Sequence, residues 1–332
     1  MVGGLNDYNY DWVATKMRPC MLICVKQCGY GYLRACRYAK KVVTLQPNSR
    51  NMKQKLTIVK VGGAVVEDET QLARLLADFT AIPGLKVLVH GGGRRATAVA
   101  AQLGIETRMV EGRRITDEDM LRVVTMVYGG LVNKTVVARL QALGANAIGL
   151  TGADAGIILS DRRPPVVVGE ASKRCSNPDV ADNASKRCID FGFVGDVRRV
   201  DATMLSRLID AGLTPVIAPL THDGQGHILN TNADTMASET AKALSELYDV
   251  TLVFAFEKAG VLRDANDDTS VIPVIDRRAF EAFRADGTIS GGMLPKVENA
   301  LKAVDAGVTR VVITSATAID GEHGTVIIKT TN

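Results

Sequence analysis

Short apolar segments alternate with amphipathic segments along the chain from Leu56 onward. The apolar segments have the length and composition of buried strands. They lie at residues 57–61, 86–90, 147–151, 214–220, 251–256 and 310–314. Helical spacing of apolar residues marks segments between them, at residues 67–80, 94–103, 116–143, 202–211, 233–247, 277–285 and 296–306. This alternation predicts an α/β fold in which helices sandwich a mostly parallel central sheet.

Local signals add detail to this prediction. Thr116 precedes three acidic residues, which is typical of a helix N-cap and the first turn after it. Gly129-Gly130 is expected to bend the long helix that follows. Turn residues bound short extended runs at 156–168 and 222–229, where we expect β-hairpins that decorate the sheet.

The charge is distributed unevenly. The chain carries 40 Lys and Arg against 36 Asp and Glu, a net charge of +4, but residues 1–53 hold nine of the basic residues and only two of the acidic ones. The remainder is therefore slightly acidic, and the net charge gives no reason to expect nucleic-acid binding. The apolar stretches fall well short of the ~20 residues that a membrane span needs.

Residues 1–53 show no sustained hydrophobic period, and we expect a doubtful or disordered N-terminal extension outside the folded body. Met52 stands directly before the first strand, as it would after an over-extended reading frame. A basic leader peptide is the second explanation. Cys20, Cys24 and Cys28 would share one helix face, but zinc needs a fourth ligand and a better spacing, which makes a zinc site the weakest interpretation.

A short repeat interrupts the α/β pattern. The pentapeptide Ala-Ser-Lys-Arg-Cys at 171–175 returns at 184–188. One repeated pentapeptide is too little for a repeat architecture, so we expect a loop insertion at 171–190. All six cysteines lie in this insertion or in residues 1–53, so the remaining chain has none. That composition suits a reducing cytoplasm.

Two glycine turns follow the ends of predicted strands, at residues 60–63 and 90–93. Bare backbone N–H groups at the carboxyl edge of a parallel sheet form a site for anions. Neither turn has the GxGxxG or GxxxxGK[ST] spacing, which disfavours a Rossmann dehydrogenase and a P-loop ATPase. One such turn alone is more often a plain tight turn, but two together favour phosphate binding.

Two lysines stand where a cation is costly. Lys60 interrupts an apolar strand, and an unpaired ammonium there is unfavourable. Lys296 stands at a predicted helix start, where the dipole disfavours a cation unless an anion is bound. Both positions suggest phosphate ligands, although Lys60 is also compatible with a side chain that reaches solvent from the strand end. Asp234, at the entry to a helix, is either part of an Asn-rich cap or a carboxylate that orients the two lysines.

Five short motifs occur in an order that resembles the amino-acid kinase family. They are Lys60-Val-Gly-Gly, His90-Gly-Gly-Gly, Gly112-Arg-Arg114-Ile-Thr, Asn230-Thr-Asn-Ala-Asp234 and Gly292-Met-Leu-Pro-Lys296. The resemblance covers residues 54–332 apart from the insertion. It implies the αβα fold of that family, with an acylglutamate-binding and dimerisation lobe at 54–227 and a nucleotide-binding lobe at 228–332.

The resemblance also implies an activity. That activity is ATP-dependent phosphorylation of the side-chain carboxylate of N-acetyl-L-glutamate, the second step of arginine biosynthesis. It implies a cytoplasmic homodimer, paired through the helix at 117–143, with ATP and Mg²⁺ as cofactors and Mg²⁺ bound through ATP. A small-molecule acylglutamate is the expected partner, without nucleic acid or membrane.

Individual roles follow from the same resemblance. Lys60 and Lys296 would stabilise the transferring phosphoryl group, and Asp234 would hold both lysines in place. Arg114 and Asn230 would bind the acylglutamate, together with Gly92 and Gly93. The phosphate-binding glycines would be Gly62, Gly63, Gly91, Gly92 and Gly93. A carboxylate nucleophile is already ionised at neutral pH, so this reaction needs alignment and charge neutralisation rather than a general base.

The chain departs from the pattern of the family, or of some of its members, in four places. Arg94-Arg95 follows the second glycine turn where the family often has Pro, and Glu257 stands where an Asp is usual near the nucleotide. The amphipathic N-terminal helix and the extra helical stretch of arginine-inhibited members are not recognisable in the sequence. We therefore expect no inhibition by arginine.

Three alternatives stay open. N-succinyl-L-glutamate is the nearest alternative substrate, because Arg94-Arg95 would complement an extra carboxylate, although a solvated helix start explains this pair equally well. Another acceptor, such as carbamate, aspartate or a nucleotide, fits the motifs of Arg114 and Asn230 less well. A non-catalytic ligand-binding regulator is disfavoured by the intact Lys60, Asp234 and Lys296.

Overall fold

A computed structural model describes residues 53–110, 112–168, 187–264, 266–291 and 293–330. The segment Lys53–Asn332 forms one compact unit. The expectations for residues 1–52, and for all of the repeat except its last two positions, lie outside the described residues. The division into lobes at 54–227 and 228–332 remains a prediction.

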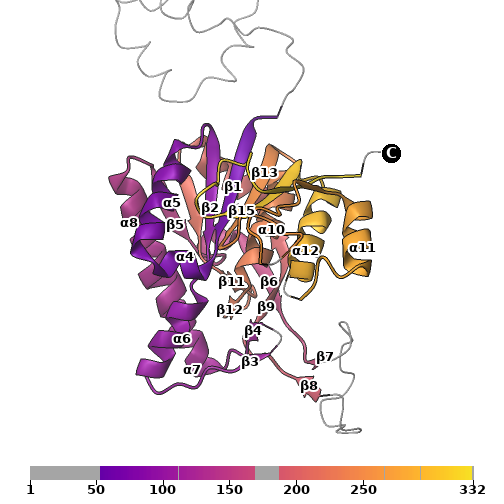
Figure 1. The fold of residues 1–332 in the computed structure, drawn as a ribbon. Helices are drawn as coiled ribbons and strands as arrows, with labels where there is room; N and C mark the ends of the chain where they lie inside the picture. The colour runs from indigo at the N-terminus through magenta and orange to yellow at the C-terminus, as the bar shows by residue number, and fades with distance from the viewer. Residues whose placement is uncertain (1–52, 111, 169–186, 265, 292, 331–332) are drawn as a thin grey trace, which may run out of the picture. The chain divides into compact units, whose positions relative to one another are not determined.

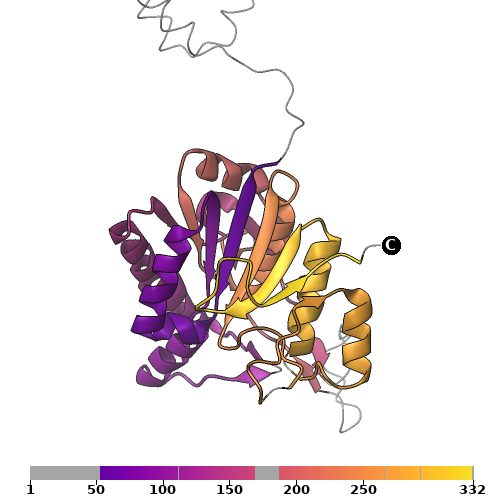
Figure 2. The ribbon, with the colours of Figure 1, turned by 45° about the horizontal axis from the view of Figure 1, so that its top comes forward.

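The centre of the unit is a sheet to which eight of the described strands belong (Figures 1 and 2). Its spatial order is β14 (Val274–Ile275), β16 (Thr325–Ile327), β15 (Arg310–Ser315), β13 (Asp249–Phe256), β1 (Lys55–Val61), β2 (Leu85–His90), β10 (Thr214–Ile217) and β5 (Ala147–Leu150). The pairings are parallel except that between β15 and β16. The predicted α/β fold with a mostly parallel central sheet is therefore confirmed.

Helices cover both faces of this sheet. One face, called here the α10 side, is covered by α9 (Ala202–Asp210), α10 (Ala233–Leu244), α11 (Arg277–Ala285) and α12 (Met293–Asp305). The other, the α8 side, is covered by α4 (Gly63–Glu67), α5 (Glu69–Ala81), α6 (Gly93–Gln102), α7 (Glu118–Val124), η1 (Thr125–Val132) and α8 (Asn133–Ala142). In the described part of the chain, no helix has the length and apolar character of a membrane span.

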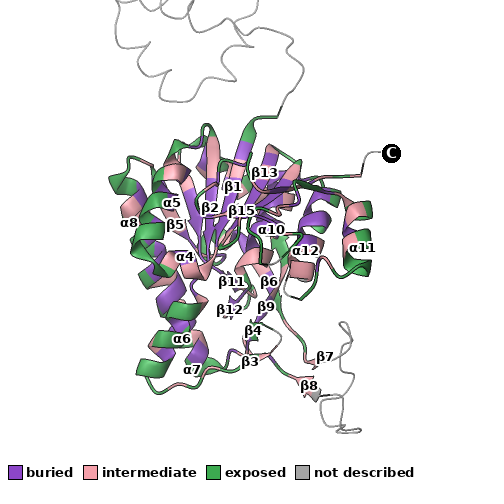
Figure 3. Cartoon of the chain, viewed as in Figure 1, coloured by how far each residue is buried: buried purple, intermediate pink, exposed green. Residues whose placement is uncertain are grey.

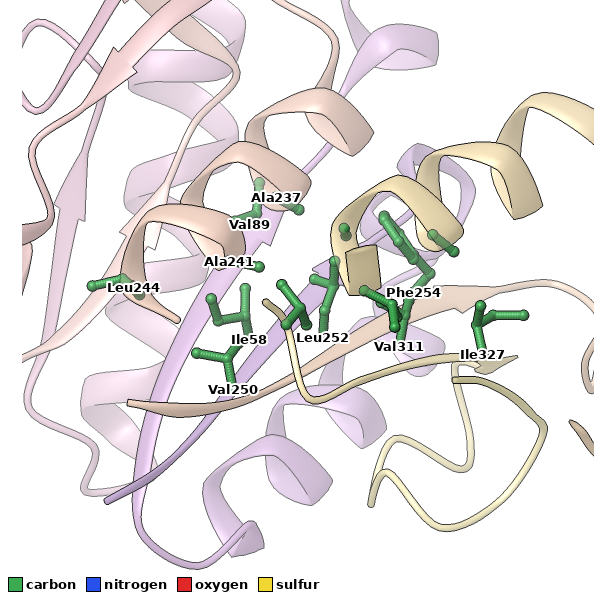
Figure 4. Packing of buried hydrophobic residues seen from close by; sticks show 14 of the residues in the cluster. Ile58, Val89, Ala237, Ala241, Leu244, Val250, Leu252, Phe254, Val311 and Ile327 are labelled. Atoms are coloured by element: carbon green, nitrogen blue, oxygen red, sulfur yellow. The ribbon is translucent and has the colours of Figure 1, made fainter. Parts of the chain in front are cut away.

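Strict alternation along the inner strands builds a separate apolar core on each face. In β1, Leu56 and Ile58 pack on the α10 side, whereas Val59 and Val61 pack on the α8 side. Successive strand residues point to opposite faces, and a parallel strand with helices on both sides must be apolar at nearly every position. Figure 3 shows the resulting buried strands between helices with exposed outer surfaces. Figure 4 shows Ala237, Ala241 and Leu244 of α10 packed over these strands.

A second, smaller sheet lies beside the central one. Its order is β12 (Ile228–Asn230), β11 (Leu220–His222), β6 (Ile158–Arg162) and β9 (Gly195–Val200). The hairpin expected at 222–229 is confirmed, because β11 and β12 pair antiparallel. The hairpin expected at 156–168 is wrong, because β6 pairs with β9 and β11, while β7 (Val166–Val168) pairs with β8 (Arg187–Ile189). Two short strands, β3 (Met109–Val110) and β4 (Arg113–Arg114), and the 3-10 turn η2 (Asp154–Gly156) complete the described elements.

The long helix predicted at 116–143 differs from expectation at its start and its middle. Its N-cap is Asp117, whose carboxylate accepts a hydrogen bond from Met120 N–H at 2.9 Å. Thr116 instead is buried and bridges to Gly192, so its cap assignment was wrong. Around Gly129-Gly130 the chain forms the π-helical segment η1 between α7 and α8. A π-helix inserts extra backbone into a helical turn and is frequent at functional sites.

Replacing Leu252 with Ala tests the core of the sheet. Leu252 is fully buried in β13 on the α10 side, so the substitution leaves a cavity and should lower the free energy of unfolding by about 2–5 kcal/mol. Leu247, which is 45% exposed, is the matched control, with an expected change within about 0.5 kcal/mol for Leu247→Ala. Urea unfolding measures both, and equal losses would contradict this placement of Leu252.

Candidate active site

Two adjoining cavities open at the carboxyl ends of β1, β2 and β13. The lysine cavity, about 450 Å³, is lined by Lys60, Arg94, Asp234, Phe256, Glu257 and Lys296 among others. The arginine cavity, about 200 Å³, is lined by Gly92, Arg113, Arg114, Tyr128 and Asn230 among others. Gly63 and Gly93 line both cavities, so the glycine turns form the wall between them. Ligands of open α/β sheets bind at this edge.

Strand alternation puts Lys60 on the α10 side, two residues beyond Ile58. Its side chain is almost completely buried, and Nζ lies 2.7 Å from Asp234 Oδ1. Asp234 comes from the first turn of α10, the helix that covers this face. A buried ammonium without a partner is strongly unfavourable, so this ion pair is what allows a lysine inside the sheet.

Asp234 is held by the start of its own helix. Asn232 is the N-cap of α10, and its Oδ1 accepts hydrogen bonds from Asp234 N–H at 2.8 Å and from Thr235 N–H at 3.0 Å. A carboxylate in the first turn is also favoured by the helix dipole. The Asn-rich segment therefore caps α10, and this cap fixes the carboxylate that pairs with Lys60. That Asp234 orients both lysines stays a prediction.

Lys296, from α12, lies over the same aromatic ring as Lys60. Its Nζ lies 3.7 Å from the centroid of Phe256, and Lys60 Nζ lies 5.3 Å from the same centroid. Burial lowers the pKa of Lys296 and the charge of Lys60 acts in the same direction, while Asp234 and Glu257 oppose them. Phe256 thus provides a cation–π surface to two ammonium groups that repel each other.

The two glycine turns are packed backbone against backbone. A Cβ atom on Gly91 would lie only 3.0 Å from Gly63 N, and one on Gly92 would lie 3.0 Å from the ring of Tyr128 in η1. No side chain fits at either position without displacing its neighbour. The N–H groups of Gly62 and Gly91 donate to Ala255 O and Val61 O, respectively.

The N–H groups at the start of α6 have a different environment. Gly92 is the N-cap and Gly93 the first helical residue, positions whose N–H groups have no carbonyl partner within a helix. Gly63 holds the same first position in α4. Of the five glycines predicted to bind phosphate, Gly63, Gly92 and Gly93 are therefore the better donors, because Gly62 and Gly91 already bond to neighbouring strands.

A buried histidine orients the second glycine turn. Asn133 Nδ2 donates to His90 Nε2 at 3.1 Å and to Val216 O at 2.9 Å. His90 Nε2 is therefore the acceptor, the ring proton is on Nδ1, and Nδ1 donates to Gly91 O at 2.8 Å. Because C=O and N–H of a trans peptide point in opposite directions, this bond turns the Gly92 N–H away from His90. Complete burial lowers the pKa of His90 to about 4, and Lys134 acts in the same direction.

Arg114 stands in the wall of the arginine cavity and is fixed by hydrogen bonds. Its Nη2 donates to Gly93 O at 2.8 Å and to Thr97 Oγ1 at 2.9 Å, and Nη1 donates to Thr107 Oγ1 at 3.2 Å. These bonds fix the guanidinium, and its positive charge, in the wall of the cavity. Asn230, at the end of β12, is held by a hydrogen bond from Nδ2 to Thr116 Oγ1 at 2.9 Å. The buried Thr116 thus positions a cavity residue instead of capping a helix.

The charges of the two cavities suit two anions that meet at the glycine turns. Four cations and two carboxylates line the lysine cavity, and the arginine cavity is lined by two arginines and two asparagine side chains. Groups of three or more His, Cys, Asp or Glu that could hold a metal ion do not occur among the residues the structure describes. The arrangement can align two anionic ligands and neutralise charge that develops between them.

Sequence comparison assigns this arrangement to a family. The family model described as "Amino acid kinase family" matches residues 55–315. The chain belongs to the amino acid kinase family. It is 61% identical over 278 residues to acetylglutamate kinases of Bacteroides thetaiotaomicron and Phocaeicola vulgatus, with 84% of this chain and 100% of each relative covered.

Among solved structures, this amino acid kinase is similar to N-acetylglutamate synthase from Neisseria gonorrhoeae complexed with coenzyme A and N-acetyl-glutamate. The TM-score is 0.66 at 20% identity, with 91% of this chain and 63% of that chain covered. At this identity the likeness concerns the fold. It agrees with the αβα sandwich described above.

The site of this amino acid kinase brings together the residues singled out in the sequence. Lys60, Asp234 and Lys296 meet in the lysine cavity, whereas Arg114 and Asn230 meet in the arginine cavity. The adjacent residues Arg94 and Arg95 line different cavities. Arg94 lines the lysine cavity, and Arg95 lines a separate cavity between α4 and α8. Neither arginine lines the arginine cavity.

Sequence reasoning did not assign Phe256, Tyr128 or the His90–Asn133 pair to the site. Phe256 ends an apolar strand, and its role depends on two lysines from distant segments. Tyr128 reaches Gly92 from the π-helical segment. His90 offered one signal, since a polar residue directly before three glycines at a strand end has to find a buried partner.

The buried His90 should make stability depend on pH. With its folded-state pKa near 4 against 6.5 in an unfolded chain, the unfolded state binds more protons between these values. The contribution is fully present above pH 6.5 and is lost as the pH falls toward 4, with a loss of about 2 kcal/mol from pH 7 to pH 5. Urea unfolding of His90→Asn, which retains a donor near the Nδ1 position, should show a shallower loss. An unchanged pH dependence in that variant would contradict the assignment.

Proposed function

We propose that this chain transfers the γ-phosphoryl group of ATP to the side-chain carboxylate of N-acetyl-L-glutamate, the second step of arginine biosynthesis. The observation that carries the proposal is the pair of cavities, in which Lys60, Asp234 and Lys296 face Arg114 and Asn230 across the glycine turns. The acetylglutamate kinases to which the chain is similar support this choice of acceptor. The nucleotide would occupy the lysine cavity and the acylglutamate the arginine cavity.

In this reaction a carboxylate oxygen of the acceptor attacks the γ-phosphorus, and the bond from that phosphorus to the β–γ bridging oxygen breaks. The products are an acyl phosphate and ADP, and no proton has to be removed from the nucleophile. Lys60 and Lys296 would neutralise charge on the transferring group, with Asp234 keeping Lys60 in place. The N–H groups of Gly63, Gly92 and Gly93 would bind phosphoryl oxygens.

Mg²⁺ would accompany the nucleotide, since Mg²⁺ in kinase sites is bound mainly by substrate phosphates and water with one or two carboxylates. The lysine cavity has two carboxylates, and both are in ion pairs, Asp234 with Lys60 and Glu257 with Arg94. This donor set fits a metal held chiefly by the phosphates. The ion would supply further neutralisation of phosphate charge.

We also infer a cytoplasmic homodimer paired through the helix formed by α7, η1 and α8. Two large apolar side chains on η1 are exposed, Met126 at 55% and Leu131 at 48%. Exposed apolar residues on one helix are suited to an interface between copies of the chain. A monomer in light scattering at micromolar concentration would contradict this inference.

Acceptor-dependent ADP release tests the proposed function. The purified chain with ATP and Mg²⁺ should release ADP on addition of N-acetyl-L-glutamate, and hydroxylamine should trap the acyl phosphate. The value of kcat/KM should be higher for N-acetyl- than for N-succinyl-glutamate; the reverse order would assign the succinylated acceptor. ATP binding without ADP release for either acceptor would identify a regulatory binding protein.

Removal of the Lys296 ammonium should slow phosphoryl transfer. We expect Lys296→Ala to lower kcat by roughly 10²–10³, as for loss of one electrostatic donor in other active sites. Lys302, exposed near the end of the same helix, is the matched control, and Lys302→Ala should retain wild-type turnover. Equal kcat values for the two variants would contradict a catalytic role of Lys296.

A further inference from the structure

Arg94 lines the lysine cavity, but the proposed reaction does not include a role for its positive charge. It is the second residue of α6, and its Nη2 lies 3.3 Å from Glu257 Oε1. Glu257 directly follows β13, so the pair joins two segments far apart in the sequence. Both side chains remain about two-thirds exposed, 67% for Arg94 and 64% for Glu257.

The order of the strands determines what this pair spans. β1 lies between β2 and β13, and Val61 is paired with His90 on one side and with Ala255 on the other. Arg94 comes from the β2 side and Glu257 from the β13 side. The ion pair therefore crosses the end of β1, where Gly62 and Gly63 lead away from Lys60. A phosphoryl group between Lys60, Lys296 and Gly63 would lie next to it.

The charges around the pair favour an exchange of partners. A cation in the first turn of a helix is disfavoured by the dipole unless an anion is near. Glu257 supplies that anion, but ion pairs exposed to this degree contribute little to stability. A terminal phosphate carries more negative charge than a carboxylate and accepts two parallel hydrogen bonds from a guanidinium. It would therefore displace Glu257 from Arg94 at small cost.

We propose that Arg94 binds the terminal phosphate of the nucleotide as a third cation beside Lys60 and Lys296. Glu257 holds the guanidinium over the end of β1 until the phosphate replaces it. During transfer the guanidinium would stabilise negative charge on the phosphoryl oxygens, an effect that Arg provides better than Lys because of its planar fork. This inference rests on the proposed function and gives its nucleotide site a further catalytic residue.

Neighbouring cations do not share this position. Arg95 is the next residue on α6, about 100° further around the helix, and it lines a different cavity together with Arg139. Lys258 also lines the lysine cavity, but it lies in the bend after β13 and not in the first turn of a helix. Arg95→Ala is therefore a matched control, since it removes the same charge from the same exposed helix start.

Steady-state kinetics with saturating N-acetyl-L-glutamate test the proposal. Arg94→Ala should lower kcat by about 10², Arg94→Lys should restore only part of it, and Arg95→Ala should stay within about twofold of wild type. Glu257→Gln should lower the KM for ATP in the wild-type background. In the Arg94→Ala background, the same substitution should leave the KM for ATP unchanged. Equal rates for Arg94→Ala and Arg95→Ala, in an enzyme that is active, would overturn the proposal.

A binding measurement separates this proposal from the proposed function. If wild-type protein shows no activity with any acylglutamate, the acceptor assignment fails, but ATP and ADP affinities still report on Arg94. Calorimetry should give about tenfold weaker ATP binding for Arg94→Ala with ADP binding unchanged, because only ATP has the third phosphate. An equal loss for both nucleotides, or no loss, would overturn the role of Arg94.

Discussion

The ion pair between Lys60 and Asp234 is the constraint on which the rest of the site depends. A lysine at the end of an inner strand is tolerated only because α10 begins at the same level of the sheet with a carboxylate in its first turn. The position of α10 is in turn set by the apolar face that it lays over β1 and β13. The packing of α10 in the core and the placement of the Lys60 ammonium are therefore coupled, because the same helix supplies the apolar contacts and Asp234.

The fold could be predicted largely from the sequence, since inner parallel strands and their covering helices leave a strong periodic signal. The predictions failed where local patterns compete with tertiary pairing. Thr116 has the surroundings of an N-cap, but it is buried and bonded to Asn230, while Asp117 caps the helix. The run at 156–168 reads as a hairpin, but each of its strands pairs with a segment further along the chain.

The site could be predicted in its composition but only in part in its geometry. Lys60 and Lys296 stand out because a cation is unfavourable at each position, and Asp234 stands out because it belongs to a polar cluster at the entry to a helix. Phe256 and Tyr128 carry no such signal. Aromatic residues at strand ends and in helices commonly pack in the core, so their presence does not indicate a functional site. The pairing of Arg94 with Glu257 depends on strand order, which brings together residues that are 163 positions apart in the chain.

The contact between the two glycine turns limits how this site can change in evolution. Gly91 and Gly63 touch through main-chain atoms, so a larger residue at one turn cannot be accommodated by a smaller one at the other. Only a movement of a whole strand or helix would make room, and both β1 and β2 are held in register by the strands around them. Variation in acceptor or nucleotide preference is thus confined to the side chains around the turns, while the turns themselves stay fixed.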